Sequence, residues 1–420
     1  MKDSGIKWIG EIPNDWFIYN IGSCTTEVNT PNGNSGEINA LQFKMGEIIR
    51  KSDGNSKYNP ETLEAYNLVD EGVVMINGLN LSFDLISQRV GLVKERGVIT
   101  STYIAIRPNE NLYPFYFNYL MKAYDNCKAF HAMGRGLRQT LSYGELKKHP
   151  IIVPPFHLQQ QIAKFLDDKC ADIDQLIALQ QQMIDELKAY KQSVITEAVC
   201  KGLDKSVPMK DSGIEWIGEV PKGWKIRKVK TLSIMINGYA FDSQKFGLNN
   251  KNKVLRIGDI FDGVINREIT TNIDDVIELE KYILQENDIV IALSGATVGK
   301  IGYVNNLNNE KIYVNQRVGI IRADNHKLLF YFLQSNVFRK YVELLSWGSA
   351  QPNISLNQIG EFKIPFSVSD GLSIVSYLDQ KCSQIDTLIS IKQQKIEELK
   401  EYKKSMIYEY ITGKKQVPNE

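Results

Sequence analysis

The sequence MKDSGIKWIGEIPNDW at residues 1–16 returns at residues 209–224 as MKDSGIEWIGEVPKGW, with 12 of 16 positions identical. A second segment is also repeated: residues 166–197 match residues 378–409 at 19 of 32 positions without a gap. The stretches between these matching segments resemble each other far less. Two copies are too few for a solenoid, so the pattern predicts a pseudo-two-fold protein with two unlike ends.

The repeated segments at 166–197 and 378–409 are predicted to be long amphipathic helices, because apolar residues recur there at heptad-like steps. In each copy, two positions of the apolar stripe are occupied by polar residues, Gln180 and Lys191 in the first copy and Lys392 and Lys403 in the second. An apolar stripe must be buried, so the two helices are expected to pack antiparallel; the alternative is that each packs only on its own domain. The expected helix-pair interface consists of Ile173, Ile177, Ile184, Leu187, Val194, Ile385, Ile389, Ile396, Leu399 and Met406.

Proline and glycine residues mark the ends of both helices. Pro154, Pro155 and Pro365 precede them, and Gly202 and Gly413 follow them. Short β-rich runs and aromatic helical stretches lie between, so each variable segment is expected to be an α/β domain with the aromatics in its core. The predicted segments are 1–150, a box with the first α/β domain; 151–208, the central helix; 209–361, the second box and domain; and 362–420, the distal helix and tail.

The two boxes, around Trp8 and Trp216, are rich in Trp, Ile and Pro. These residues suit packing, so each box is interpreted as a hook that joins its domain to the helix of the other half; the alternative is that the boxes dock directly with a partner protein. The Val-Pro pair that precedes the second box returns at the end of the chain. The C-terminus is therefore expected to lie near the N-terminal box.

Composition limits the possible functions. A chain of 420 residues with 43% hydrophobic content can form two ordinary cores. There is no apolar run of about 20 residues and no signal-peptide core, so a cytoplasmic protein without membrane contact is expected. The five cysteines form no CxxC pair and the four histidines no HExxH motif. We therefore expect neither a metal site nor a cofactor.

Several enzyme motifs are incomplete in this sequence. The run SGATVGKI at 294–301 is too short for a phosphate-binding loop and lacks its Ser or Thr ligand for magnesium. The run VPPF at 153–156 is similar to the Pro-Pro-aromatic motif of amino-methyltransferases. The side chain of Val153, however, has no polar atom that could hydrogen-bond a target amine. Glu145 and Lys147 have nuclease-like spacing but no preceding Pro-Asp pair. No catalytic residue is predicted.

Polar loops follow the aromatic helical stretches, GRGLRQTLS at 134–142 and WGSAQPNIS at 347–355. Their small residues allow a backbone to approach a ligand, and Arg, Gln and Asn side chains can hydrogen-bond base edges. The net charge of +1 is not that of a basic protein, but the acidic helices can hide basic patches elsewhere. The expected DNA contacts are Arg89, Arg135, Arg138, Gln139, Ser294, Thr297, Lys300, Ser349, Gln351 and Asn353.

The duplicated DSGIxWIGExPxxW box, the paired LDxKxxxID helices and the runs LRIGDI (255–260) and IVIALSGATVGKIGYV (289–304) resemble the specificity subunits of type I restriction-modification systems. The resemblance covers essentially the whole chain. It implies two target recognition domains, each reading one half of a bipartite site in double-stranded DNA. It also implies helices that dock methyltransferase subunits, with two expected, and motor-nuclease subunits in the full complex.

That resemblance implies a subunit without catalysis of its own, and the unlike domains imply an asymmetric target. The fold class expected is thus α/β, with two target recognition domains joined by two long antiparallel, coiled-coil-like helices. The helices would set the spacing between the half-sites. The alternatives are a protein-interaction scaffold or the specificity part of another multi-subunit restriction or methylation system. A fused methyltransferase or nuclease would need motifs that are absent here.

Overall fold

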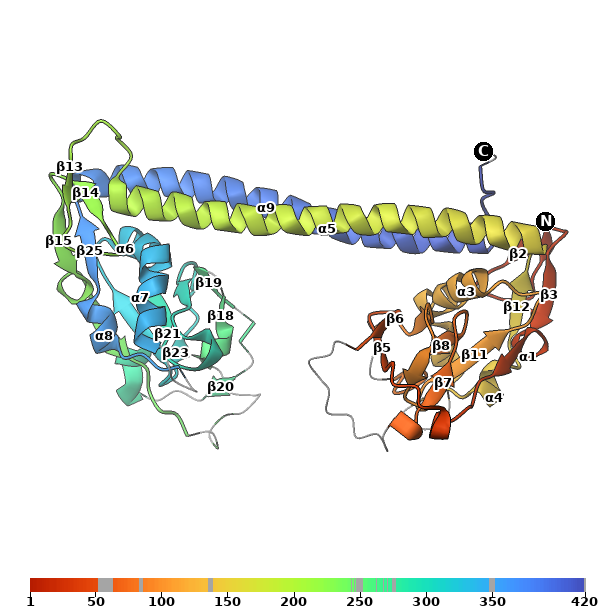
Figure 1. Cartoon of the computed structure of the whole chain (residues 1–420). Coiled ribbons are helices and arrows are strands. Elements are labelled where there is room, and N and C mark those ends of the chain that lie inside the picture. The colour runs from red at the N-terminus through yellow and green to blue at the C-terminus, as the bar shows by residue number, and fades with distance from the viewer. Residues whose placement is uncertain are drawn as a thin grey trace. The chain divides into compact units, whose positions relative to one another are not determined.

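The computed structural model describes residues 1–51, 63–82, 86–134, 139–242, 244, 246, 252–261, 263–266, 268–269, 271–273, 277–346 and 352–418. The chain forms two compact units. The first comprises Met1–Gln180 and Gln394–Glu420, and the second comprises Gln181–Gln393. Each unit therefore contains one box, one α/β domain and a section of both long helices (Figure 1).

The long helices are α5 (Phe156–Lys201) and α9 (Val368–Ile411). In the first unit, the rings of Phe165 and Tyr410 lie 4.5 Å apart, and Asp174 pairs with Lys403 at 2.6 Å. Residue numbers rise along α5 as they fall along α9, so the helices are antiparallel. Four predicted interface residues belong to the core of this unit or pack against it: Ile173, Ile177, Leu399 and Met406.

The second unit contains the same arrangement. Lys392 lies 3.4 Å from the sulfur of Met183, and Lys191 pairs with Asp386 at 2.6 Å. The predicted antiparallel helices are confirmed. The remaining predicted interface residues are buried (Ile184, Val194, Ile385, Ile396) or half-buried (Leu187, Ile389) on their helices.

The two interhelical ion pairs are copies of each other. Lys191 and Lys403 occupy the same polar step of the repeated stripe, and their partners Asp386 and Asp174 are also repeat mates. Each lysine side chain is only about a quarter exposed. A polar residue on a helix seam favours the one register in which it finds its partner, so these pairs specify how α5 and α9 align.

The α/β domain of the first unit has a four-stranded antiparallel sheet in the order β4-β11-β8-β9. Helix α3 (Pro114–Asn126) packs on this sheet, and its aromatic residues are in the core as predicted. A separate ladder, β3 with β12, leads into α5. The strands are β3 (Phe17–Asn20), β4 (Thr25–Glu27), β5 (Leu41–Lys44), β6 (Glu47–Arg50), β7 (Asn67–Val69), β8 (Val74–Ile76), β9 (Val90–Leu92), β10 (Gly97–Ile99), β11 (Ile104–Pro108) and β12 (Pro150–Val153).

The domain of the second unit repeats this plan. Its six-stranded sheet has the order β16-β24-β21-β22-β19-β18, and its first four strands correspond to β4-β11-β8-β9. Strand β15 pairs with β25, as β3 pairs with β12. The fold is therefore duplicated even where the sequences differ. The strands are β15 (Lys225–Lys228), β16 (Ile234–Asn237), β17 (Asn252–Leu255), β18 (Ile260–Phe261), β19 (Gly263–Ile265), β20 (Asn272–Ile273), β21 (Ile289–Ala292), β22 (Ile301–Tyr303), β23 (Ile312–Val314), β24 (Val318–Arg322) and β25 (Lys363–Phe366).

The first box packs on the end of α9. It contains the short strands β1 (Lys2–Asp3) and β2 (Glu11–Ile12). The hydroxyl of Tyr408 donates to the carbonyl of Trp8 at 3.0 Å, and Lys414 donates to the carbonyl of Glu11 at 2.6 Å. Gly413 adopts a φ of 72° where a Cβ would lie 2.6 Å from the Pro13 ring. The C-terminal region thus lies against the N-terminal box, as predicted.

The second box packs on the end of α5 in the same manner. It contains β13 (Met209–Asp211) and β14 (Glu219–Pro221). Trp224 lies in one core with Ile195 and Val199, and its indole donates to Asp370 at 2.6 Å. Gly202, with a φ of 73°, lies against the same indole. Both boxes are therefore hooks that hold a domain to the helix of the other half.

Candidate nucleic-acid interface

In the second unit, the two loops predicted to contact DNA lie side by side. Ser294 and Asn353 form an isolated β-bridge although 59 residues separate them in sequence. The Gly295 amide donates to the Pro352 carbonyl at 2.9 Å, and the Ile354 amide donates to the Leu293 carbonyl at 2.8 Å. The polar segment that follows β21 (residues 293–300) and the segment at residues 352–355, which precedes helix α8 (Leu356–Glu361), thus form one surface.

Local sequence explains why these loops meet. Ser355 caps helix α8 (Leu356–Glu361), because its side chain and that of Gln358 bond reciprocally to the first turn. Gly299 turns the other loop at a φ of 80°, where a Cβ would lie 2.7 Å from Val342. A side chain at position 299 would push the loop away from helix α7 (Asn336–Ser346).

The paired loops contain hydrogen-bonding groups without partners. The hydroxyl oxygens of Ser294 and Thr297 are shielded from solvent and have no hydrogen-bond partner among the described residues. An unsatisfied buried hydroxyl costs about 1–3 kcal/mol, so a ligand atom that completes these bonds would be favoured. Lys300 and Asn353 are exposed beside them.

Two arginines that the sequence did not predict lie beside the paired loops. The Arg317 carbonyl accepts a bond from the Leu293 amide, and Arg256 precedes Ile257, which lies next to Gly295. Both residues are exposed, and neither they nor Lys300 form an ion pair within the described part of the chain. Arg256 follows β17 and Arg317 precedes β24, so each adjoins a β-rich run, which is the signal that could have identified it. The loops are therefore bordered by three cations, with Asp259 beside Arg256.

The first unit pairs its loops in the equivalent way. The Leu141 amide donates to the Gly78 carbonyl at 2.9 Å, and the Leu81 amide donates to the Gln139 carbonyl at 3.3 Å. A Cβ at Gly78 would lie 2.5 Å from the Leu141 carbonyl oxygen, so glycine permits this approach. Gln139, a predicted DNA contact, lies in this pairing. The predicted contacts Arg135, Arg138, Ser349 and Gln351 lie outside the described residues.

Arg89 does not belong to a DNA-contacting surface, and that prediction is wrong. The residue is 1% exposed, although it follows an exposed segment. Its guanidinium donates to the carbonyls of Leu79 at 2.8 Å and Asn77 at 3.1 Å, and its amide donates to Asp125 at 2.7 Å. The two guanidinium bonds hold the side chain inside the domain, so Arg89 instead holds the loop that follows β8.

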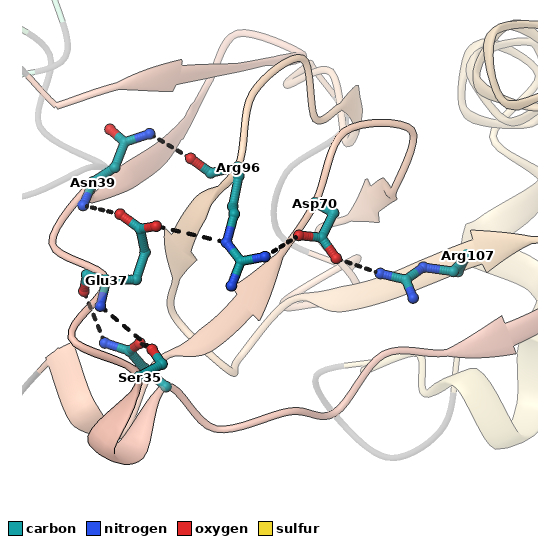
Figure 2. Close-up of polar contacts among 7 residues, drawn as sticks. Ser35, Glu37, Asn39, Asp70, Arg96 and Arg107 are labelled. Carbon is teal, nitrogen blue, oxygen red and sulfur yellow. Dashed lines mark hydrogen bonds and ion pairs between the residues drawn. The ribbon is translucent and has the colours of Figure 1, made fainter.

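Arg96 belongs to an ion-pair network (Figure 2). It lies 3.7 Å from Glu37 and 3.3 Å from Asp70, whose other oxygen is 2.8 Å from Arg107. The Asn39 side chain donates to the Arg96 carbonyl. These partners balance the positive charge, so the network ties the segment around Glu37 to the sheet.

Three further expectations concern catalysis, metal binding and membranes. Glu145, which had nuclease-like spacing with Lys147, accepts a bond from the Ser142 amide at 3.0 Å and caps a short helix. Among the described residues, no group of three His, Cys, Asp or Glu side chains could hold a metal ion. No described helix is both long and apolar enough to cross a membrane.

Comparison with known proteins identifies the family. A profile described as "Type I restriction modification DNA specificity domain" matches residues 85–189 and 221–401, which is more than half of the chain. The chain belongs to this family. The type I restriction enzyme MjaVIII specificity subunit of Methanocaldococcus jannaschii is 28% identical over 336 residues, covering 77% of this chain and 76% of the relative. The putative MjaX specificity subunit of the same organism is 23% identical, covering 97% and 95%.

Solved structures share the fold of this specificity-family chain. A chain solved in work on complex assembly and conformational transition of the type I R-M system superposes with a TM-score of 0.70, at 14% identity, covering 96% of this chain and 98% of that one. The HsdS subunit from Thermoanaerobacter tengcongensis has a TM-score of 0.50 at the same identity and coverage. The match over both full lengths agrees with the duplicated α/β plan and the two long helices.

Proposed function

We propose that this specificity subunit reads an asymmetric bipartite site in double-stranded DNA and catalyses no reaction itself. The supporting observation is the loop pair that occurs at the same edge of equivalent sheets in both units. The pairing is conserved between the two units, with Leu141 bonded to Gly78 in one and Ile354 bonded to Leu293 in the other. The side chains that the loops present differ. Equivalent scaffolds with different polar groups suit two different half-sites.

Exposed apolar positions on the long helices support the proposal that two methyltransferase subunits dock there. Three exposed apolar positions on α5 recur at the repeat-equivalent positions on α9: Leu176 with Leu388, Leu179 with Ile391, and Tyr190 with Tyr402. Each is about half exposed or more. Duplicated apolar surface outside the helix seam is typical of protein interfaces. Two copies of one surface fit two copies of one partner, with motor-nuclease subunits joining the full complex.

The test is methylome sequencing of a host without adenine methylation that expresses this chain together with its cognate methyltransferase. An asymmetric bipartite adenine motif should appear only when both are present, with the methyltransferase alone as the control. A motif in the control, or no motif with both proteins although they co-purify, would contradict DNA reading by this chain and favour a scaffold.

The docking surface has its own test. Leu388→Asp with Ile391→Asp should reduce co-purification of the methyltransferase, because each carboxylate would be buried without a partner. Glu397→Gln on the same helix, at an exposed position, is the control and should leave co-purification unchanged. Equal co-purification of all variants would contradict docking through this surface.

A further inference from the structure

We propose that a basic surface of the second unit binds the phosphate backbone of DNA beside the second half-site. This inference rests on the proposed DNA-reading function but concerns a different surface from the paired loops. The basic surface consists of Lys225, Arg227, Lys228, Lys230 and Lys363. Contacts of this kind add affinity without reading sequence.

The β15–β25 ladder brings the cations into one short stretch of the second unit. Side chains alternate along a strand, so Lys225 and Arg227 lie on one face of the ladder and Lys228 and Lys363 on the other. Residues 225–231, KIRKVKT, contain four cations and no carboxylate. Lys228 lies directly opposite Lys363 across the ladder, and like charges at such positions are destabilising. Lys225, Arg227 and Lys363 are exposed. The free protein therefore holds repulsive charges on a rigid backbone, which an approaching polyanion would relieve.

Among the residues that the structure describes, one carboxylate forms ion pairs with this surface. Glu361 lies 2.6 Å from the Lys228 ammonium and also pairs with Lys230. Bonds from the two lysines lower the pKa of Glu361 to about 2, so it is ionised at neutral pH. One negative charge against five positive charges leaves a clear excess, which is the electrostatic condition for binding phosphates.

The surface lies close to the proposed base-reading loops. The helical turn η4 (Val229–Thr231) packs on α8, where a Cβ at Gly360 would lie 3.1 Å from the Cβ of Lys230. Helix α8 begins beside Asn353 and has six residues, so its two ends are about 9 Å apart at 1.5 Å per residue. At about 3.4 Å per nucleotide along a strand, this spans roughly three base pairs. One duplex can therefore meet both surfaces.

The distribution of the charges favours DNA over a protein partner. The equivalent strand of the first unit, β3, reads FIYN and carries no charge. The apolar positions proposed for methyltransferase docking occur on both helices, whereas the cations of β15 have no counterparts on β3. Two equivalent copies of one protein partner would be expected to use equivalent surfaces, whereas the two half-sites of DNA meet domains that already differ in sequence. Four cations within residues 225–230 suit the closely spaced phosphates of DNA.

The experiment measures the salt dependence of DNA binding by the methyltransferase complex containing this chain. The probe is a fluorescent duplex carrying the methylated motif. A triple variant of the three exposed cations that form no ion pair among the described residues, Lys225→Gln, Arg227→Gln and Lys363→Gln, should lower the slope of log affinity against log salt by about 0.9 per lost phosphate contact. For three contacts, the wild type should lose about 40-fold more affinity than the variant between 50 and 200 mM salt. The methylated motif should not change.

A second variant gives an effect of opposite sign. Glu361→Gln releases Lys228 and Lys230 from their carboxylate, so DNA binding should tighten and the salt slope should steepen. A merely structural role for this surface would not strengthen binding. The control removes three lysines that are already paired with carboxylates, Lys169→Gln, Lys205→Gln and Lys415→Gln. It changes the net charge equally and should leave the slope unaltered.

The outcomes are distinguishable. Unchanged slopes in both test variants, or equal loss in the control, would overturn the proposal. A changed second half-site would show base reading rather than phosphate binding, and failure of the triple variant to hold the methyltransferase would show a protein contact; either result also overturns it. If the wild-type complex itself bound the motif no better than other DNA, the proposed function would fail instead.

Discussion

Replacing the buried Arg89 by methionine should relax recognition of the first half-site alone. The Arg89 guanidinium donates to the Leu79 and Asn77 carbonyls at 2.8 and 3.1 Å, and the residue is 1% exposed. A hydrogen bond from a charged donor contributes about 1.5–3 kcal/mol, so losing two destabilises the ordered loop by about 3–6 kcal/mol. That is a change of more than 100-fold in the ordered population. The loop adjoins Gln139 through Leu81, so the proposed base contacts would lose their fixed position.

The assay combines methylome sequencing with hydrogen exchange of residues 77–81. Arg322→Met is the matched control, because Arg322 also bonds buried groups, donating to Asp288 at 2.7 Å and to the Ile283 carbonyl at 2.8 Å. It lies at the far end of β24 from the paired loops, so it should lower stability without altering either half-site. Faster exchange in the Arg89 variant with an unchanged first half-site would refute the reasoning. Relaxation of both half-sites would also refute it.

Three further predictions concern stability. Gly413→Ala should lower the free energy of unfolding by about 1–2 kcal/mol or more, because the residue has a φ of 72° and a Cβ would contact the Pro13 ring; thermal unfolding measures the loss. Lys191→Asp should destabilise the helix pair, and adding Asp386→Lys should restore most of the lost stability. A double-mutant cycle should give a coupling energy of about 0.2–1 kcal/mol. No coupling would contradict a role of this ion pair in setting the register. Burial raises the pKa of Asp125 above its usual 3.8, so ionising this carboxyl as pH rises through the folded-state pKa lowers the free energy of unfolding. Relative to the wild type, Asp125→Asn should therefore be more stable at pH 7 than at pH 4 in urea unfolding. The same difference from the wild type at both pH values would contradict this.

Part of the candidate site could be predicted from residue type and spacing. Ser294, Thr297, Lys300 and Asn353 were predicted from two separate polar loops, and the structure brings those loops into one surface. Their role as DNA contacts stays a prediction. Arg256 and Arg317 were missed, because each lies outside the loops that composition singled out. Their position beside the same loops depends on how the strands pair and pack, which sequence spacing does not reveal.

Arg89 shows the opposite error. The two residues before it, Ser87 and Gln88, are polar and exposed, so charge alone suggested a surface residue. Burial depended instead on three backbone carbonyls and Asp125, which reach it only after β8, β9 and α3 pack together. A buried arginine is stable only when such partners are present, and none of them is evident from the local pattern.

The sequence was enough to predict the duplication and the two long helices, and it favoured their antiparallel pairing and the packing role of the boxes. These features depend on apolar periodicity and on residue types that favour or end helices, which act over a few turns of chain. Three contacts are visible only in the folded protein: Lys191 with Asp386, Ser294 with Asn353, and Lys228 opposite Lys363. Those contacts join segments far apart in the chain, so they exist only once the cores have aligned the strands and helices.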